Sequence, residues 1–450
     1  MKFVSPSQRA PRYFEKVDGS SFLPIGLNLC FLRDSESRKE AEVLETFRFW
    51  MTEFARNGGN FIRVWLGVPF FDIMPDRPGQ YSEKNLSHIR FIVDLAEKLG
   101  IRIKFTLEHF RRIGYGSDTE LFPGVVDFNK PLYLGLVSNM REYLESPECR
   151  KIYLAKAKRL ADAGFGDSEA VIAWELWNEI NCIGSEEEIG PWSEFMVAEL
   201  SKLFPHQMIV QNLGSFSGAT GYRSYDALAR LNGNGFLQIH RYLDPGAEMD
   251  VCRGPMDVLC SDAIRELRDR SSSLPVVLAE CGAVEANHAR YSDLYASDRE
   301  GTLLHDMLFA PFFSGSAGCG QAWHWDHLYI QKHHLYHHFA RFAKAVEGVD
   351  PVEENFVPYH TETHRLRIYG LRGKKHTLLW CRDKQNDWRR ELVERIAPDE
   401  LHGERIPVEG HGECSCYLPW ENCERSLSQK DGWCELPDFR RSIVVRISSK

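Results

Sequence analysis

The chain has 450 residues, of which 43% are hydrophobic and 26% are charged, and its formal net charge is -9. This length exceeds one small domain and fits a large α/β domain with a smaller companion. The negative charge argues against nucleic acid or an anionic membrane surface as the main partner. No apolar run reaches the roughly 18 to 20 residues that cross a bilayer.

The amino-terminal sequence and the cysteine content indicate the cellular compartment of the chain. Residues 1–16 contain no apolar core of signal-peptide length, which favours the cytoplasm, or secretion if a leader has been removed. The 12 cysteines are too sparse for a disulfide scaffold and lack CxxC pairs, so we expect mostly reduced, buried thiols. Bridges remain open for two close sets, Cys252 with Cys260 and Cys414 with Cys416.

Apolar runs bounded by turn signals predict eight strands in chain order. They cover residues 22–30, 60–68, 101–110, 171–179, 208–214, 236–242, 275–282 and 319–325. Helical periodicity fills most of the intervals, and the first two helices are predicted to end at Gly58-Gly59 and at Gly100. The strands are almost continuously apolar, which is typical of strands buried on both faces of a parallel sheet.

Eight strand–helix units predict a (β/α)8 TIM barrel over residues 1–350, with a hairpin around Asp18-Gly19 ahead of the first strand. A doubly wound open sheet is the alternative, but it normally carries a glycine-rich phosphate turn after its first strand. The sequence "GLNLCFLRDSES" has no such turn. Short alternating strands over residues 351–450 predict a small antiparallel β-sandwich as a second domain.

Polar residues recur near the carboxyl end of strand after strand, which is the end where barrels of this kind carry their chemistry. In chain order they are Arg63, His109, Asn178, Glu179, His240, Tyr242, Glu280 and Trp323. Chance would scatter such residues along the strands. We therefore predict a functional site at this end of the barrel.

Two carboxylates from different strands are what the cleavage of a glycosidic bond requires. One protonates the departing oxygen, and the other either attacks the anomeric carbon or activates water. Glu179 and Glu280 end the fourth and seventh predicted strands. If their carboxyl carbons lie about 5 to 5.5 Å apart, the reaction retains the anomeric configuration, and a gap of about 6.5 to 9.5 Å would mean inversion.

The motifs resemble those of clan A glycoside hydrolases, most of all glycoside hydrolase family 5, the cellulase and mannanase family. "LWNE" and "VLAECG" match the places of that family's acid/base and nucleophile, which are Glu179 and Glu280 here. "FIRVW", "LEHF", "IHRY" and "QAWHW" match its other site positions, at Arg63, His109, His240, Tyr242 and Trp323. The resemblance covers roughly residues 22–345. At His109 the preceding Glu108 departs from the usual aspartate-leucine context.

The resemblance implies a retaining hydrolase of β-linked oligosaccharides or polysaccharides of the glucan or mannan type, acting by double displacement without a cofactor. Glu280 must then be ionised, with Arg63 and Tyr242 holding its carboxylate, while Glu179 must start protonated. Asn178 would donate to the sugar 2-hydroxyl. His109 and His240 would bind sugar hydroxyls or the acid/base, and Trp323, preferred to Trp325, would offer a flat face to a sugar ring.

Other interpretations compete with this one. A carbohydrate-binding barrel without catalysis would normally lack the carboxylate pair. The histidines of "HHLYHH" (333–338) have helical spacing that could bind a metal, but no carboxylate set accompanies them and we expect no metal site. Glu108, Glu175 and Asp326 are competing carboxylates, and Glu175 is expected one layer below Glu179. Candidate sugar platforms in the loops are Phe70, Phe71, Tyr115, Phe122 and Trp192.

Overall fold

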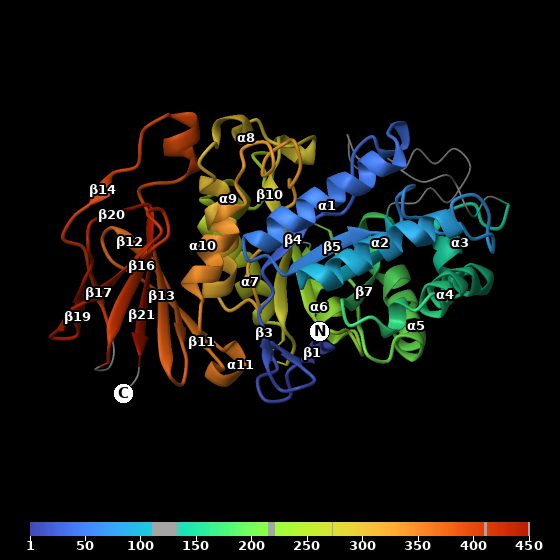
Figure 1. Cartoon of the computed structure of the whole chain (residues 1–450), viewed down its shortest axis with the longest axis horizontal. Coiled ribbons are helices and arrows are strands. Elements are labelled where there is room, and N and C mark those ends of the chain that lie inside the picture. The colour runs from blue at the N-terminus through green and yellow to red at the C-terminus, as the bar shows by residue number, and fades with distance from the viewer. Residues whose placement is uncertain (110–132, 134, 215–220, 272, 409–411, 449–450) are drawn as a thin grey trace.

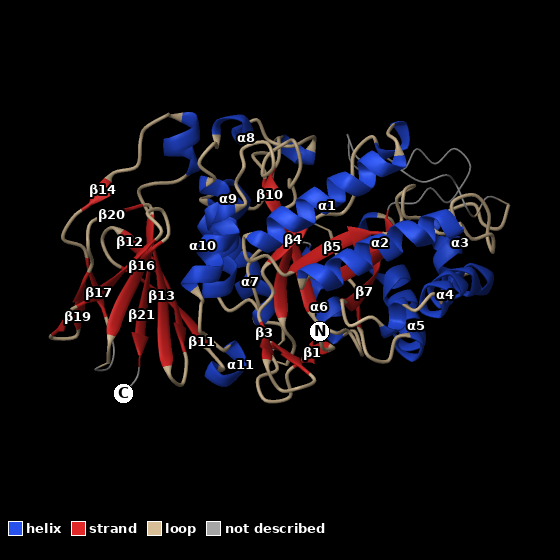
Figure 2. Cartoon of the chain, viewed as in Figure 1, coloured by secondary structure: helices blue, strands red, loops and turns tan. Residues whose placement is uncertain are grey.

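The computed structural model describes the chain except residues 110–132, 134, 215–220, 272, 409–411 and 449–450. Two regions lie side by side along its longest axis (Figure 1). The first contains parallel strands with helices around them, and the second consists mainly of antiparallel strands (Figure 2). No helix of the described residues combines the length and the apolar character that a membrane span requires.

Seven parallel strands form the centre of the first region. One sheet has the order β4-β5-β6-β7-β8, and β9 pairs with β10 in a second. Their bounds are β4 Gly26–Asn28, β5 Phe61–Trp65, β6 Arg102–His109, β7 Val171–Asn178, β8 Met208–Val210, β9 Leu237–Leu243 and β10 Val276–Ala283. Every residue of these strands is buried, which agrees with their nearly continuous apolar sequences.

Helices separate the parallel strands along the chain. Their bounds are α1 Glu40–Arg56, α2 Glu83–Leu99, α3 Met140–Glu145, α4 Pro147–Asp162, α5 Glu186–Leu203, α6 Gly221–Arg230, α7 Met256–Arg268, α8 Leu294–Ser297, α9 Thr302–Phe313, α10 His337–Ala345 and α11 Pro351–Glu354. The predicted stop signals act as expected. Helix α1 ends just before Gly58, and α2 ends at Gly100, which adopts a left-handed backbone with φ 75°.

Single-turn elements fill several loops of both regions. They are η1 Ser35–Ser37, η2 Phe165–Asp167, η3 Ile180–Cys182, η4 Asp250–Arg253, η5 Ala286–His288 and η6 Arg389–Val393. The predicted amino-terminal hairpin is present, because β2 (Phe14–Lys16) pairs antiparallel with β3 (Ser21–Phe22) around Gly19. A further strand, β1 (Val4–Pro6), extends this sheet on the other side of β2.

The prediction of an eighth strand over residues 319–325 is wrong, because the structure has no regular strand there. Only Ala322 forms strand-like bridges, one to Leu27 of β4 and one to Cys281 of β10. Gly318 and Gly320 show how tightly the start of this segment is packed. A Cβ at these positions would lie 2.2 Å from the Pro24 carbonyl oxygen and 2.3 Å from that of Met307. The segment still connects the two parallel sheets, since the Asn28 amide donates to the Ala322 carbonyl at 3.3 Å and the Trp323 amide donates to the Cys281 carbonyl at 2.9 Å.

Antiparallel sheets make up the second region, as predicted. A six-stranded sheet has the order β11-β12-β13-β21-β16-β17, accompanied by the small sheets β14-β20 and β15-β19-β18. Their bounds are β11 Val357–Glu362, β12 Leu366–Arg372, β13 His376–Asp383, β14 Glu400–Leu401, β15 Arg405–Pro407, β16 Cys414–Leu418, β17 Cys423–Leu427, β18 Gln429–Lys430, β19 Trp433–Glu435, β20 Phe439–Arg440 and β21 Ser442–Ser448.

The six-stranded sheet contributes its two faces to two different cores. Along β13, Leu378 and Trp380 join the large core of the first region. Leu379 and Cys381 point the other way, into a second buried cluster shared with the small sheets. Helix α9, whose residues are all buried, lies between the parallel strands and this sheet (Figure 1). The two regions therefore share one continuous packing interface.

Buried ion pairs cross this interface. Asp257 of α7 accepts two hydrogen bonds from Arg367, at 2.6 and 2.9 Å, and one from the Tyr369 hydroxyl at 2.9 Å. Arg382 donates to Asp306 of α9 at 2.8 Å. Removing one partner of such a pair leaves an uncompensated buried charge, which is strongly destabilising.

We therefore expect Asp257→Ala to lower the free energy of unfolding by about 3 kcal/mol or more, because Arg367 would be left buried without its carboxylate. Urea unfolding measures this loss. Asp293→Ala is the matched control, since Asp293 is exposed and pairs only across one turn with Arg290, and it should change little. Equal stabilities for the two variants would contradict the packed interface.

Candidate active site

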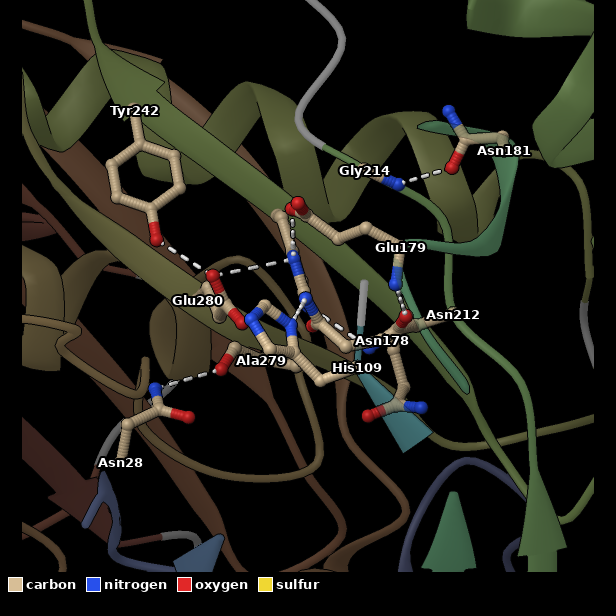
Figure 3. Close-up of polar contacts among 12 residues, drawn as sticks. Asn28, His109, Asn178, Glu179, Asn181, Asn212, Gly214, Tyr242, Ala279 and Glu280 are labelled. Carbon is tan, nitrogen blue, oxygen red and sulfur yellow. Dashed lines mark hydrogen bonds and ion pairs between the residues drawn. The ribbon is translucent and has the colours of Figure 1, made fainter. Parts of the chain in front are cut away.

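The structure brings the predicted site residues together at the carboxyl ends of the parallel strands. Arg63 lies in β5, His109 ends β6, and Asn178 ends β7 with Glu179 directly after it. His240 and Tyr242 come from β9 and Glu280 from β10. Figure 3 shows Tyr242, Glu280, Asn178, His109 and Glu179 converging on one place. Residues far apart in the sequence therefore form one buried polar cluster.

Glu280 is held from two sides and is only 4% exposed. Arg63 Nη1 donates to its Oε1, and the Tyr242 hydroxyl donates to its Oε2 at 2.7 Å (Figure 3). Burial raises the pKa of Tyr242 well above its usual value, so this hydroxyl keeps its proton and remains a donor. A charged donor and a neutral donor on one carboxylate stabilise its ionised form.

Glu179 has an unusual backbone. It lies between β7 and η3 with φ 51° and ψ 50°, in the left-handed region that non-glycine residues seldom adopt. Its amide donates to Asn212 Oδ1 at 2.7 Å (Figure 3), and its Oε1 lies 2.7 Å from His240 Nδ1. Such backbone strain, of order 1 to 3 kcal/mol, persists only where the surroundings enforce it, and it gathers at functional sites.

The two carboxylates lie close together. One oxygen each from Glu179 and Glu280, with a ring nitrogen of His240, all lie within 4.8 Å of one another. His240 Nδ1 is 3.4 Å from Glu280 Oε2. Burial lowers the pKa of His240 to about 4, and the charge on Glu280 opposes this only in part. The imidazole between the two carboxylates is therefore neutral at physiological pH.

A layer of buried charge lies beneath the pair. Arg63 also donates to Glu175 and, at 2.6 Å, to Asn178 Oδ1. On its far side Glu175 pairs with Lys104 at 2.8 Å. Burial alone would raise the pKa of Glu175, but the charges of Arg63 and Lys104 outweigh it and hold that pKa at about 2. Glu175 is thus a buried counter-ion for Arg63, in the deeper layer predicted for it.

His109 and Trp323 lie to one side of the carboxylates. The His109 ring stacks on Trp65, with centroids 3.9 Å apart, and burial lowers its pKa well below the usual value. Trp323 is partly buried against Trp65, with centroids 5.0 Å apart. Trp325 is 1% exposed. The preference for Trp323 as the accessible tryptophan therefore agrees with its exposure.

The prediction that Phe71 and Trp192 could serve as sugar platforms is wrong, because neither side chain is accessible. Phe71 is buried, and Trp192 is buried inside α5 against Tyr153 and Trp177. The predicted loop before Trp192 is helical from Glu186, where Ser185 and Glu188 form a capping box that the sequence already displays. Phe70 stacks on His88, with centroids 4.0 Å apart. Tyr115 and Phe122 lie outside the described residues.

The competing carboxylates and histidines have other partners. Glu108 pairs with Lys156 at 2.8 Å, and Asp326 pairs with Arg33 at 3.3 Å. In the "HHLYHH" stretch, His333 and His338 bind the separate carbonyls of Tyr295 and Glu300, at 2.8 and 2.7 Å. Among the described residues, the group with metal-ligand spacing is the Glu179, His240 and Glu280 set.

Comparison with known proteins identifies chains of similar fold. No family model matches the sequence. A mannan endo-1,4-beta-mannosidase of Oryza sativa subsp. japonica is 24% identical over 244 residues, which cover 46% of this chain and 52% of the relative. A glycoside hydrolase family 5 structure from Bacteroides vulgatus superposes with TM-score 0.61 at 13% identity, covering 99% of this chain and 93% of the other. An exo-beta-1,4-mannosidase from an Opitutaceae bacterium gives TM-score 0.52 at 18% identity, covering 75% and 61%.

The resemblance to glycoside hydrolase family 5 is confirmed. The chain spans about half the length of the curated mannosidase that it matches. The family 5 structure covers nearly the whole chain, including the antiparallel region that the sequence resemblance did not reach. The likeness in fold to this solved structure therefore extends over both regions of the chain.

Sequence reasoning missed three residues around the site. Asn28 of β4 donates to the Ala279 carbonyl at 3.0 Å, next to Glu280 (Figure 3). Asn212 contacts Glu179 and His240. His288, after β10, packs edge-on against Tyr242 with centroids 4.6 Å apart. Asn28 ends β4 and Asn212 follows the end of β8 by two residues, whereas the predicted strands extend to residues 30 and 214, so neither amide stands at a predicted strand end.

We expect Glu175→Gln to lower the free energy of unfolding at pH 7 by about 3 kcal/mol, because it removes a buried carboxylate that two cations stabilise. The pKa of Glu175 is lowered from 4.5 to about 2, so its contribution is complete above pH about 5 and is lost as pH falls toward 2. The gap between wild type and variant should thus narrow by about 1 kcal/mol between pH 7 and pH 4.

Urea unfolding of both proteins at pH 7, 5.5, 4.5 and 4 measures this gap. Glu194→Gln is the control, because Glu194 is exposed on α5 and its replacement should leave stability unchanged at every pH. A gap that stays constant or widens down to pH 4 would show that the Glu175 carboxylate is not the stabilised ionised form.

Proposed function

We propose that the chain is a retaining β-glycoside hydrolase, with Glu280 as nucleophile and Glu179 as acid/base. The observation that carries this proposal is the pair of buried carboxylates whose oxygens lie within 4.8 Å of each other. Single oxygens this close support the separation of about 5 to 5.5 Å between carboxyl groups that retention requires, rather than the 6.5 to 9.5 Å of inversion. The pair is also asymmetric, because Glu280 pairs with the Arg63 guanidinium and Glu179 has its 2.7 Å contact with the His240 imidazole.

In the first step the Glu280 carboxylate attacks the anomeric carbon while Glu179 gives its proton to the departing glycosidic oxygen. A covalent glycosyl-enzyme forms, and the leaving sugar departs with a new hydroxyl. Arg63 and Tyr242 hold the two oxygens of the Glu280 carboxylate and orient it for attack. The guanidinium also faces Glu175, so its charge is shared and does not fully pair with the nucleophile.

In the second step Glu179, now a carboxylate, takes a proton from water, and the hydroxide attacks the anomeric carbon. The bond to Glu280 breaks, and two inversions give net retention. Asn178 is held by Arg63 through its oxygen, so its amide nitrogen is the side that can donate to the sugar 2-hydroxyl. His109 and His240 are neutral, so each carries one N–H, and His240 faces the acid/base through Nδ1. Trp323 provides an apolar face for the ring.

The substrate that we propose is a β-linked oligosaccharide or polysaccharide of the mannan type. Both named mannosidases with which this chain shares sequence or fold support mannose over glucose. Hydroxyl stereochemistry is read by the placement of hydrogen-bonding groups, so the matching arrangement of strands is a reason to test mannosides first. Glucosides are the comparison substrates.

We further propose the architecture that this function needs. Residues 1–350 would form a closed (β/α)8 barrel, with residues 321–323 in the place of the eighth strand between β10 and β4. On the opposite side, the Gly235 amide donates to the Ile209 carbonyl at 2.9 Å, which supports closure between β8 and β9. Residues 351–450 would form a β-sandwich accessory domain around the second buried cluster.

We predict that Glu280→Ala abolishes turnover of an activated aryl β-mannoside and that added azide restores it as the α-mannosyl azide. Azide fits the space of the deleted carboxylate and attacks once, so configuration is inverted. In Glu179→Ala, azide should instead attack the glycosyl-enzyme and give the β-mannosyl azide. Product configuration by NMR decides between the two.

The opposite pairing of azide products would exchange the roles of Glu179 and Glu280. If the wild-type chain releases no product from aryl mannosides or glucosides but binds mannan in a pull-down, the chain is a carbohydrate-binding barrel without catalysis. Glu108→Gln serves as the control, because Glu108 is buried but pairs with Lys156, and it should show no rescue by azide.

A further inference from the structure

Asn212 lies just beyond the end of β8 and is fully buried. Its Oδ1 accepts the amide hydrogen of Glu179 at 2.7 Å (Figure 3), and its Nδ2 lies 3.2 Å from His240 Nε2. It therefore touches both the proposed acid/base and the histidine that contacts the acid/base. No motif of the sequence singled out this residue.

The amide of Glu179 fixes which way the Asn212 side chain points. A backbone N–H can only donate, so the atom facing it must be the oxygen of Asn212. The nitrogen of the same amide group then faces His240 Nε2 and donates to it. This orientation follows from the contacts, because a flipped amide would place two donors against each other.

The orientation of Asn212 in turn sets the tautomer of His240. A neutral imidazole carries one N–H and one bare nitrogen. Since Nε2 accepts from Asn212, the proton is on Nδ1, which lies 2.7 Å from Glu179 Oε1. His240 is therefore a donor to Oε1. When Glu179 is protonated, its proton belongs on Oε2, since Oε1 already accepts a hydrogen bond.

We propose that Asn212 is a positioning residue that holds His240 as the Nδ1–H tautomer and so directs the acid proton of Glu179 to Oε2. By accepting the Glu179 amide, Asn212 also supports the left-handed backbone that aims this side chain. The inference rests on the proposed function in one respect, because it assigns the acid role to Glu179. The tautomer itself is a property of the resting protein.

Asn212→Asp tests the proposal with an isosteric change. The introduced carboxylate can accept the Glu179 amide as before, but at pH 7 it also accepts from Nε2 and draws the imidazole proton there. Nδ1 then becomes an acceptor that faces Glu179 Oε1 and attracts the acid proton to the wrong oxygen. General acid catalysis contributes about 100-fold or more, so unactivated mannosides should lose about 100-fold in kcat/KM.

Activated dinitrophenyl mannosides, which need little protonation, should lose less than about 5-fold. Asn181→Asp is the matched control, because Asn181 Oδ1 likewise accepts a backbone amide, that of Gly214, at 2.6 Å (Figure 3). It adds the same charge nearby, and both substrate classes should respond to it equally. Asn212→Ala is a second variant, which removes the donor to His240 Nε2. In this variant too, unactivated mannosides should lose more kcat/KM than dinitrophenyl mannosides.

Nitrogen NMR of labelled histidine reads the tautomer without any substrate, with His240→Gln to assign the signal. We expect protonated Nδ1 and bare Nε2 in the wild type, and the reverse in Asn212→Asp. A wild-type proton on Nε2, or equal losses on both substrate classes in Asn212→Asp and Asn212→Ala, would overturn the proposal. If the wild type hydrolyses nothing yet shows the Nδ1–H tautomer, the proposed function fails and the positioning of His240 stands.

A separate observation concerns the cysteines of the second region. Cys414 of β16 lies 3.5 Å, sulfur to sulfur, from Cys434 of β19, a partner that neither close set in the sequence includes. Both are buried, at 7% and 0% exposed. Strand β16 belongs to the six-stranded sheet and β19 to the three-stranded sheet, so this contact joins the two.

We infer that Cys414 and Cys434 form a disulfide when a disulfide oxidant of the glutathione class is present. The two thiols lose two protons and two electrons, the oxidant is reduced to two thiols, and one S–S bond forms between β16 and β19. The bond closes a loop between residues 20 positions apart. It would restrict the unfolded chain and fasten the small sheet to the large one.

The full-length protein, equilibrated with oxidised glutathione and then alkylated, tests this inference by peptide mapping. We expect a linked peptide pair containing Cys414 and Cys434 and a rise in Tm of about 3 °C or more that dithiothreitol reverses. Cys414→Ser should lose both effects, while Cys416→Ser, two residues along the same strand, should keep them. Alkylation of both Cys414 and Cys434, or a Cys414–Cys416 bridge, would overturn it.

Discussion

The guanidinium of Arg63 lies between two carboxylates, Glu175 below and Glu280 above, and all three side chains are buried. Removing charges from water costs several kcal/mol for each ion, and the cost is offset only when every charge has a well-placed partner. Lys104 completes the set by pairing with Glu175. Without this sequence of alternating charges, a buried ionised Glu280 would be too costly to keep. The position of the Glu280 carboxylate therefore depends on the buried ion pairs in the layer below it.

The two proposed catalytic carboxylates differ in how they are held, and this difference suits their different tasks. Glu280 contacts groups that favour a fixed negative charge, Arg63 and Tyr242. Glu179 contacts a neutral imidazole, and its own backbone is in the left-handed conformation. A nucleophile benefits from one constant protonation state, whereas an acid/base has to change state twice in each cycle. The asymmetry of the surroundings thus separates the roles more clearly than the residue types do.

Much of this arrangement could be predicted from the sequence, because the signals for it are local. Apolar runs with helical intervals located all seven parallel strands, and strand ends located Glu179 and Glu280. The length of the eighth strand could not be judged from "CGQAWHW", since its pairing is restricted to bridges of Ala322 with the distant strands β4 and β10. Burial of Phe71 and Trp192, and the pairing of Cys414 with Cys434, likewise depend on elements far away in the chain. The networks through Asn28 and Asn212 were missed because a single amide carries no periodic signal.

Strand β21 lies in the middle of the six-stranded sheet, between β13 and β16, although it comes from the end of the described chain. During synthesis its neighbours leave the ribosome first and have no central strand on which to assemble. Until Ser442–Ser448 is present, the sheet is two separate halves, β11-β12-β13 and β16-β17, and α9 packs against β12 and β13 of the first half. A chain that lacks Ser442–Ser448 would therefore keep the half of the sheet that covers α9 but would lose the join between β13 and β16, because β21 pairs with both.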